Sequence, residues 1–300
     1  PMSLNPAQLE AVHYTAGPLL VLAGAGSGKT RVITHKIGAL VSEGVPAYAV
    51  AAVTFTNKAA REMRQRAATL LDKDTAKALK ISTFHTLGLN ILRREYGNLG
   101  YKRGFTIFDA HDSRALVKEL LRSDNADTEA AVDMACAAIS NWKSELVDPA
   151  MALAGAADDL EAARARQYAA YQRALQAYNA LDFDDLIVRP VFLFRELPQV
   201  LAAWQDRIQY MLGDEYQDTN QAQYQLMSQL VGARGAFTVV GDDDQSIYAW
   251  RGARPDNLKR LAEDFPALRV IKLEQNYRST QRILEAANGL IANNPHLFEK

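Results

Sequence analysis

Cysteine is almost absent from this chain of 300 residues: Cys136 is the only one, and the histidines number five. A single cysteine excludes an internal disulfide, and no Cys or His pair has the C-x-x-C or H-x-x-x-H spacing of a metal site. Long hydrophobic runs are also lacking, since the longest, such as Leu19 to Ala23, fall far below the roughly 20 residues that span a bilayer. The N-terminus has no basic-then-apolar signal pattern. These absences predict a protein of the reducing cytoplasm with no membrane segment.

An excess of charge of one sign is lacking as well. The chain has 34 Lys+Arg against 35 Asp+Glu, so its formal net charge is -1. This balance excludes attraction of the whole molecule to a polyanion, and any nucleic-acid binding must be local. Residues 1–100 nevertheless carry 12 basic and 6 acidic side chains, and Lys58, Arg61, Arg64 and Arg66 lie in one short predicted helix. By itself that helix is better read as a solvated face than as a nucleic-acid contact.

What the chain does have is a recurring strand pattern in a composition that is 48% hydrophobic, enough for a large core. Apolar runs without strict alternation indicate strands buried on both faces of a parallel sheet. Helical segments follow most of them, which predicts the α/β class with crossover connections. The predicted strands are 19–23, 50–55, 81–84, 208–212, 237–240 and 270–273.

The region between the third and fourth predicted strands has a different composition. From about Asn90 to Trp204 the chain is Ala-rich and shows no strand-like run, as in EAARARQYAAYQRALQAY at 161–178. Such a composition favours helices. We therefore expect an all-helical subdomain inserted into the parallel sheet core.

A glycine-rich segment follows the first predicted strand, and Lys29 and Thr30 open the next helix. Glycines let the backbone turn tightly and direct N–H groups at a phosphate at a helix N-terminus. The pattern is that of a Walker A loop, with Ala23 where the first glycine is usual. We expect Lys29 on the β- and γ-phosphates and Thr30 on Mg²⁺; a glycine-rich turn that binds nothing is the alternative. The predicted nucleotide-binding residues of this loop are Ala23, Gly24, Ala25, Gly26, Ser27, Gly28, Lys29 and Thr30.

Asp214 and Glu215 follow the fourth predicted strand. Open α/β sheets bind their ligands at the carboxyl ends of the strands. Mg²⁺ requires hard oxygen ligands, and an attacking water requires orientation or a base. We expect Asp214 to hold the metal through water and Glu215 to polarise the hydrolytic water. An Asp-Glu pair is usually a surface feature, so this interpretation depends on the Walker A loop.

Five further motifs complete the pattern: TFTNKAAREM (54–63), ISTFHTLGLN (81–90), GDEYQDTN (213–220), GDDDQSIYAWRGARP (241–255) and LEQNYRST (273–280). With these motifs the chain resembles superfamily 1 DNA helicases of the Rep/UvrD/PcrA group, most closely the Rep branch, over essentially its whole length. The resemblance implies a P-loop NTPase (RecA-like) core. It also implies a first RecA-like domain from 1–88 and 197–276, the inserted subdomain at 89–196, and the start of a second RecA-like domain at 277–300.

The resemblance implies roles around the nucleotide. Gln8 would bond the adenine edge, on a helix that Asn5 and Pro6 begin well as cap and first residue. Tyr277 would stack on the adenine and Arg31 would flank it. Gln245 and Arg278 would contact the γ-phosphate, where an arginine stabilises the charge that develops in phosphoryl transfer. The predicted catalytic residues are Lys29, Glu215, Gln245 and Arg278.

The resemblance also implies a path for single-stranded DNA, which needs aromatic faces and phosphate contacts. Phe55, Tyr248 and Trp250 would stack on bases, although core packing is the usual role of aromatic side chains. Thr83, His85 and Arg251 would touch the backbone, with His85 as a hydrogen-bonding link rather than a proton donor. The basic helix with Asn57 and Lys58 joins this path.

The function implied by the resemblance is that of an ATP-dependent, 3′-to-5′ single-stranded DNA translocase and DNA helicase of replication or repair, using ATP and Mg²⁺. Its partners would be single-stranded DNA, duplex junctions and replication or repair proteins, with no membrane. This chain would be the N-terminal part, a monomer with weak or no turnover alone. Two alternatives stay open: a nucleotide- and DNA-binding module without turnover, and a motor subunit of a helicase-nuclease repair complex.

Overall fold

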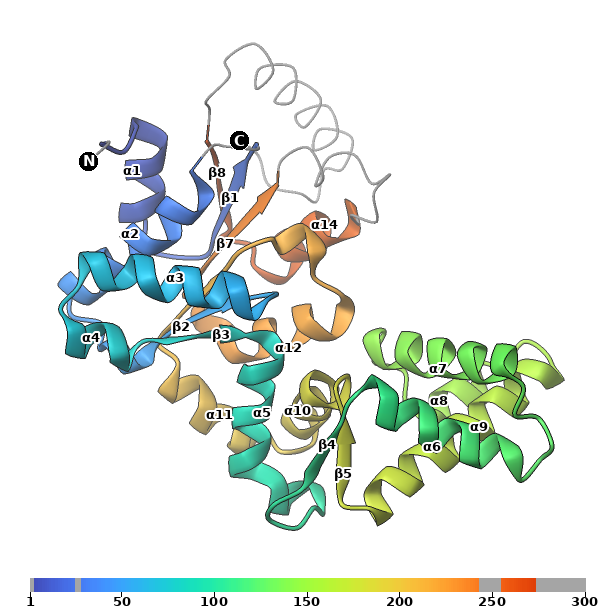
Figure 1. The fold of residues 1–300 in the computed structure, drawn as a ribbon. Coiled ribbons are helices and arrows are strands. Elements are labelled where there is room, and N and C mark those ends of the chain that lie inside the picture. Colours follow the sequence, from blue (N-terminus) through green and yellow to red (C-terminus); the bar gives the residue numbers. More distant parts are fainter. Residues whose placement is uncertain (1–2, 25–27, 243–254, 274–300) are drawn as a thin grey trace. The chain divides into compact units, whose positions relative to one another are not determined.

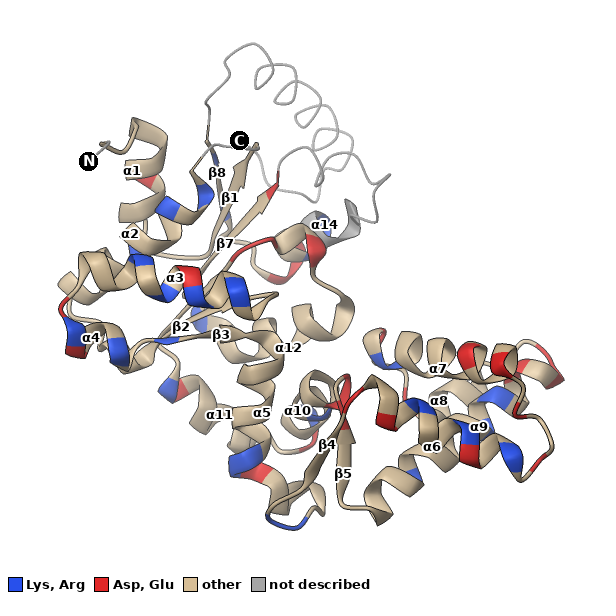
Figure 2. Ribbon diagram, viewed as in Figure 1, with Lys and Arg blue, Asp and Glu red and all other residues tan. Residues whose placement is uncertain are grey.

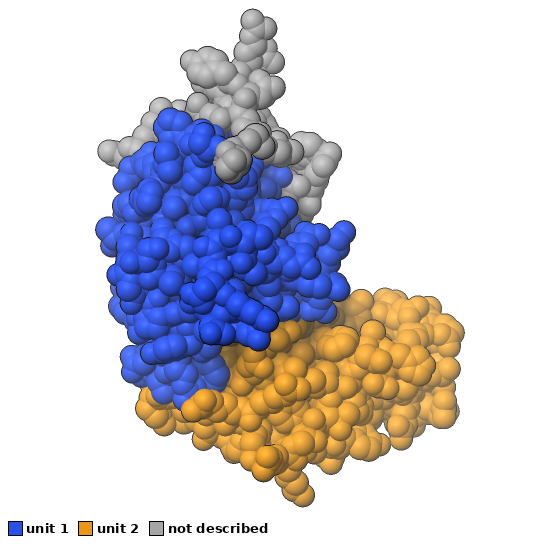
Figure 3. Space-filling view, turned by 60° about the vertical axis from the view of Figure 1, so that its left-hand side comes forward, with its two compact units in different colours: residues 1–83, 202–219, 230–300 blue, residues 84–201, 220–229 orange. Residues whose placement is uncertain are grey.

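The computed structural model describes residues 3–24, 28–242 and 255–273. The chain forms two compact units (Figure 3). Unit 1 consists of residues 1–83, 202–219 and 230–300, and unit 2 of residues 84–201 and 220–229. Both stretches of unit 2 therefore lie between stretches of unit 1 in the sequence.

Unit 1 is built on a six-stranded parallel sheet with strand order β3-β2-β6-β7-β1-β8 (Figure 1). Each strand coincides with one of the predicted runs to within two residues at either end, and the predicted α/β class is confirmed. The runs could be found in the sequence because central parallel strands are buried on both faces and read as continuous apolar segments. The strands are β1 (Leu19–Ala23), β2 (Val50–Thr54), β3 (Lys80–Thr83), β6 (Tyr210–Gly213), β7 (Phe237–Asp242) and β8 (Arg269–Leu273).

The register of the sheet brings three strand ends together. Ala23, the last residue of β1, pairs with Asp242 of β7, and Gly213, the last of β6, pairs with Val239 of β7. All strands run in the same direction, so the chain leaves β1, β6 and β7 at one edge of the sheet. The glycine-rich loop and the Asp214–Glu215 pair thus start from neighbouring positions.

Helices cover both faces of this sheet. One face packs on α1 (Pro6–His13), α2 (Lys29–Ser42) and α3 (Asn57–Leu70) in a single apolar cluster. On the other face Phe237 meets Phe265 with ring centroids 4.8 Å apart, just after α14 (Pro255–Asp264). Unit 1 also contains α4 (Lys73–Ala78) and all but the first four residues of α11 (Pro198–Arg207). The burial of both faces fixes the sheet, and with it the positions of the loops at its edge.

Unit 2 is mainly helical, but it also contains two short strands that the sequence did not predict. It contains β4 (Thr106–Phe108) and β5 (Ala180–Asp182), which form a two-stranded parallel sheet, so the insertion is not all-helical. Three residues are too few for a periodic pattern, and 71 residues (109–179) separate the two strands. The sequence therefore contains no local signal for either strand. The helices are α5 (Phe84–Glu95), α6 (Ala110–Arg122), α7 (Glu129–Ser144), α8 (Pro149–Ala154), α9 (Asp159–Ala177), α10 (Asp185–Glu196) and α12 (Gln221–Val231), whose last two residues belong to unit 1.

A buried ionic cluster connects four elements of unit 2. Lys143 of α7 is 1% exposed, and its Nζ lies 2.7 Å from Asp182 Oδ2 and 3.0 Å from Asp185 Oδ1. The Tyr171 hydroxyl donates a hydrogen bond to Asp182 at 2.7 Å. Burial opposes ionisation of Asp182, but Lys143 outweighs it and holds the pKa of that carboxyl below its usual value. The cluster joins α7, α9 and β5 to the start of α10.

Helices α5 and α10 approach closely at Gly88. A Cβ atom at this position would lie 1.7 Å from the carbonyl oxygen of Leu186, so only glycine fits. Among the described residues, no helix of either unit is long and apolar enough to cross a membrane.

Candidate active site

The site begins where α2 leaves the glycine-rich loop. Gly28 is the N-cap of α2 and has φ +80°, in the left-handed region that favours glycine. A Cβ atom there would also lie 2.5 Å from Nε2 of Gln8. Lys29 and Thr30 form the start of α2, as predicted. The intervening loop residues Ala25, Gly26 and Ser27 lie outside the described residues.

Gln8 is held beside this loop by the cap of α1. The Gln8 backbone N–H donates to Asn5 Oδ1 at 2.8 Å, and the Asn5 N–H donates to Gln8 Oε1 at 2.9 Å. This is the reciprocal capping box. The side chain of Gln8 is nearly buried, at 3% exposure. The expected helix start at Asn5 and Pro6 is therefore confirmed, and it fixes Gln8 against Gly28.

Lys29 reaches across the edge of the sheet to the carboxylate pair. Its Nζ lies 3.3 Å from Glu215 Oε1, with the two side chains 20% and 40% exposed. The Glu215 backbone has φ +48°, which is rare for a residue with a side chain. Strained backbone of this kind occurs mainly where the surrounding structure imposes it, often at functional sites. The turn after β6 therefore directs the Glu215 carboxylate toward Lys29.

Gln217, which the sequence analysis did not single out, completes this arrangement. Its Nε2 donates to Glu215 Oε2 at 2.6 Å, and its Oε1 accepts from the Asp242 N–H at 2.8 Å. The side chain is 5% exposed. Gln217 thus joins the turn after β6 to the end of β7. No spacing rule could have identified it, because its partners are set by a short 3₁₀ turn (Tyr216–Asp218) and by the order of the strands.

Asp214 is the most perturbed acid of the site. Its Oδ1 is buried and has no hydrogen-bond partner among the described residues. Burial, assisted by the nearby charge of Glu215, raises the pKa of Asp214 to about 7. An unpartnered buried carboxylate oxygen is unfavourable unless a cation or a donor reaches it. A carboxylate and a hydroxyl, here Asp214 and Thr30, are hard oxygen ligands of the kind that suits Mg²⁺.

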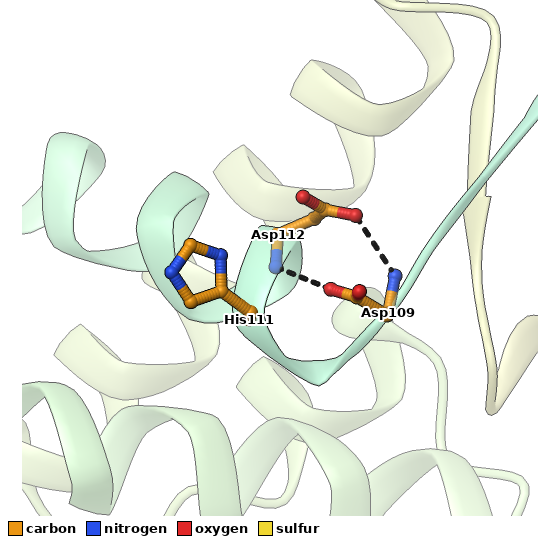
Figure 4. A group of neighbouring side chains, drawn as sticks. All are labelled: Asp109, His111 and Asp112. Carbon is orange, nitrogen blue, oxygen red and sulfur yellow. Dashed lines mark hydrogen bonds between the residues drawn. The ribbon is translucent and has the colours of Figure 1, made fainter.

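A second cluster of possible metal ligands is explained by helix capping. Asp109, His111 and Asp112 bring one ligand atom each within 4.8 Å of one another, and all three are exposed (Figure 4). The Asp112 N–H donates to Asp109 Oδ1 at 2.8 Å, and the Asp109 N–H donates to Asp112 Oδ2 at 3.2 Å. The two carboxylates thus form the capping box of α6. We assign them to helix stability.

The residues predicted for DNA binding begin at the end of β2. Phe55 follows this strand and is partly buried, while Asn57 and Lys58 are exposed at the start of α3. The Thr56 hydroxyl caps the helix by accepting from the Ala59 N–H at 3.0 Å. Several Lys and Arg residues, drawn in blue, lie along α3 in Figure 2. Phe55 and this helix start are thus brought together by one strand end.

Two more residues predicted for DNA binding, Thr83 and His85, lie at the end of β3 and just after it. Thr83 is the last residue of β3 and is buried, whereas His85 belongs to α5 in unit 2. The His85 ring meets the Phe183 ring edge-on at 6.5 Å between centroids. Burial lowers the pKa of His85 against the opposing charge of Asp184. A pKa lowered from 6.5 leaves the imidazole mostly neutral at pH 7, and its role as a hydrogen-bonding link stays a prediction.

Of the remaining predicted residues, the structure describes only Arg31. Arg31 is partly buried on α2, with its Cδ 3.9 Å from where a Cβ of Gly28 would stand. The others lie outside the described residues, and their roles stay predictions: they are Gln245, Tyr248, Trp250, Arg251, Tyr277 and Arg278.

Comparison with known proteins gives one family. Residues 4–266 match the model of the family described as UvrD/REP helicase N-terminal domain. All 300 residues align with the ATP-dependent DNA helicase Rep of Salmonella typhimurium at 57% identity and with that of Escherichia coli at 56%, covering 44% and 45% of those proteins. The ATP-dependent DNA helicase PcrA of Staphylococcus aureus is 48% identical over 293 residues, which are 97% of this chain and 40% of the relative. The chain thus spans less than half the length of these relatives.

Proposed function

Because the chain belongs to the family of the UvrD/REP helicase N-terminal domain, we propose that it is the ATP-binding part of a DNA helicase. That helicase uses ATP and Mg²⁺ to move 3′ to 5′ along single-stranded DNA in replication or repair. The observation that carries the proposal is that Lys29, at the start of α2, contacts Glu215 beside Asp214, whose Oδ1 has no hydrogen-bond partner among the described residues.

The chemistry follows from these side chains. The α2 N-terminus and Lys29 attract the phosphates of a nucleotide. A bound phosphate replaces Glu215 as the partner of Lys29, which frees Glu215 to orient and polarise a water molecule. Gln217 holds the second oxygen of Glu215, so the carboxylate keeps its direction when Lys29 turns to the phosphate. Thr30 and Asp214 would hold Mg²⁺, which when bound neutralises phosphate charge.

We assign unit 1 to the first RecA-like domain and unit 2 to its insertion. The boundaries expected from the sequence were 1–88 and 197–276 for the domain and 89–196 for the insertion, whereas the structural units change at 83/84 and 201/202. In addition, residues 220–229 associate with unit 2. The assignment of 277–300 to a second RecA-like domain stays a prediction.

A DNA path is proposed along the same edge of the sheet. Phe55 after β2 and Thr83 at the end of β3 are on neighbouring strands, and the basic start of α3 supplies Lys58. An aromatic face with nearby cations and hydroxyls suits single-stranded DNA without regard to sequence. Duplex junctions and replication or repair proteins as partners, a monomeric state and a cytoplasmic location stay predictions.

ATP hydrolysis by the whole chain, with and without single-stranded DNA, tests this function. We expect Lys29→Ala to abolish nucleotide binding and turnover, because it removes the phosphate cation. Glu215→Gln should retain binding and lose turnover, because an amide cannot polarise water as a carboxylate does. Turnover by Glu215→Gln equal to a measurable turnover of the parent, or loss of ATP binding in this variant, would contradict the proposed role.

The two alternatives predict different results. A binding module without turnover would bind ATP and DNA in titrations, yet it would hydrolyse no ATP with or without DNA. A motor subunit of a helicase-nuclease complex would in addition associate with nuclease subunits in a pull-down from its own cells. Stimulation of hydrolysis by single-stranded DNA without such subunits favours the helicase.

A further inference from the structure

Lys36 is a buried cation that the proposed chemistry does not use. It lies on α2, the helix that Lys29 opens, about two turns further along. Its side chain is 0% exposed. Its Nζ donates to the carbonyl oxygens of Ala11 at 2.8 Å and Tyr14 at 2.5 Å. No salt bridge to a carboxylate is found for Lys36 among the described residues. A lysine buried in this way requires a specific reason.

The two carbonyls identify what Lys36 does. Helix α1 ends at His13, and Tyr14 is its C-cap, so the last carbonyls of this helix have no partner within it. Lys36 satisfies the carbonyl of Ala11 and that of the cap itself. An ammonium group at this end is also attracted by the negative end of the helix dipole. Lys36 therefore anchors the C-terminus of α1 to α2.

The other end of α1 is fixed to the same helix α2. Gln8 packs against Gly28 at the N-terminus of α2. A Cβ atom at Gly28 would lie only 2.5 Å from Gln8 Nε2. Helix α1 has eight residues, so it is a short rod of roughly 12 Å. It is thus held at two points, by Gln8 at the glycine-rich loop and by Lys36 at its far end. Movement at the Lys36 end would displace Gln8.

We propose that Lys36 is a positioning residue that holds α1, and through it the Gln8 side chain, in place for recognition of the nucleotide base. This inference rests on the proposed function, in which Gln8 contacts the adenine edge. Two lysines of α2 then have different roles. Lys29 determines affinity for the phosphates, and Lys36 determines selectivity for the base.

The surroundings of Lys36 make this selectivity depend on pH. Burial lowers the pKa of Lys36 to about 7, and the charge of Glu43 at the C-cap of α2 opposes this. The other titratable groups facing it are the Tyr210 ring of β6, 5.6 Å from Nζ, and Tyr14 after α1. The ammonium form is present below this pKa and is lost as pH rises through it. The attraction to the α1 C-terminus is then lost as well.

The test measures binding of three probes with Mg²⁺ to the whole chain: ATP, GTP and inorganic tripolyphosphate, which has no base. Lys36→Met keeps most of the stem and removes the charge. We expect it to weaken ATP binding by roughly tenfold, the scale of one partly buried charge at a helix end. Tripolyphosphate and GTP binding should stay unchanged. The control Lys77→Met, at an exposed lysine of α4, should alter none of the three.

Outcomes separate this inference from the proposed function. Equal loss of all three probes in Lys36→Met, or an unchanged ratio of ATP to GTP affinity, would overturn the positioning role. Lys29→Ala should abolish the binding of all three probes. If Lys29→Ala changes nothing, the proposed phosphate site is wrong, whatever Lys36 does to the ratio.

A second variant covers the case in which Lys36→Met fails to fold. Glu43→Gln changes a surface group whose Oε2 accepts from the Thr15 hydroxyl at 3.3 Å. Removing its charge lowers the pKa of Lys36 further, because Glu43 is the group that raises it. The ATP preference of the parent should decline as pH rises through about 7, and that of Glu43→Gln should decline at lower pH. The same pH profile in both proteins contradicts the inference.

Discussion

Replacing Asp214 by asparagine should stabilise the chain in the absence of Mg²⁺ and nucleotide. The pKa of this carboxyl is raised from 3.8 to about 7, chiefly by burial and then by Glu215. The folded state therefore binds a proton more tightly than the unfolded state. Stability from this group is fully present below pH 3.8, declines as pH rises, and is lost above about pH 7. Asparagine does not ionise and avoids that loss.

The magnitude follows from the same shift. The interval from 3.8 to about 7, at about 1.36 kcal/mol per pH unit, corresponds to about 4 kcal/mol at pH 8. This is a ceiling, because the asparagine amide must also be buried and one of its atoms inherits the unpartnered position of Oδ1. We expect a net gain of roughly 2 kcal/mol in the free energy of unfolding at pH 8.

Urea unfolding of both proteins at pH 8 and pH 5 measures the effect. The gain should be largest at pH 8 and should shrink at pH 5, where the parent carboxyl is protonated in the folded state. Asp206→Asn, at an exposed aspartate of α11, is the matched control and should show no such pattern. Lower stability of Asp214→Asn at pH 8, or an equal gain at both pH values, would refute the reasoning. With Mg²⁺ and ATP added, the parent should gain more stability than the variant.

Three further changes test other parts of the structure. Gly28→Ala, at φ +80°, should weaken ATP binding about tenfold, because the new Cβ strains the backbone and displaces Gln8. Gly24→Ala has nothing within 4 Å of its Cβ, so it should change ATP affinity little in the same titration. Lys143→Met leaves two buried carboxylates without their cation and should lower the free energy of unfolding in urea by about 3–5 kcal/mol. Adding Asp185→Asn should restore part of this stability. Full stability of the single variant would contradict the role of Lys143 in the cluster. Trp250→Ala should weaken single-stranded DNA binding by about 1–3 kcal/mol in an anisotropy titration, and unchanged affinity would remove the stacking role.

The parallel sheet could be predicted because burial on both faces leaves apolar runs that are visible without knowledge of partners. Lys29, Asp214 and Glu215 could be predicted for a related reason. Each directly follows a strand or opens a helix at the edge where parallel strands end, so chain position alone implied that they meet. The 3.3 Å contact of Lys29 with Glu215 agrees with that expectation.

The features that were missed depend on contacts between distant residues. Gln217 is defined by its bonds to Glu215 and to the Asp242 N–H, 25 positions away, which depend on the order of β6 and β7. Lys36 resembles a solvated helix lysine in the sequence, and only the carbonyls at the end of α1 explain its burial. The strands β4 and β5, three residues each, pair across a long separation. Local patterns contain no signal for such pairs.

The central claim is that Lys29, Thr30 and Asp214 form one site for ATP with Mg²⁺. Isothermal titration of the whole chain with ATP, with and without Mg²⁺, tests it most directly when run on the parent, Lys29→Ala and Asp214→Asn. We expect one site per chain in the parent, binding that is lost in Lys29→Ala, and a dependence on Mg²⁺ that is weakened in Asp214→Asn. ATP binding of equal strength in all three proteins, or binding indifferent to Mg²⁺ in the parent, would contradict the account.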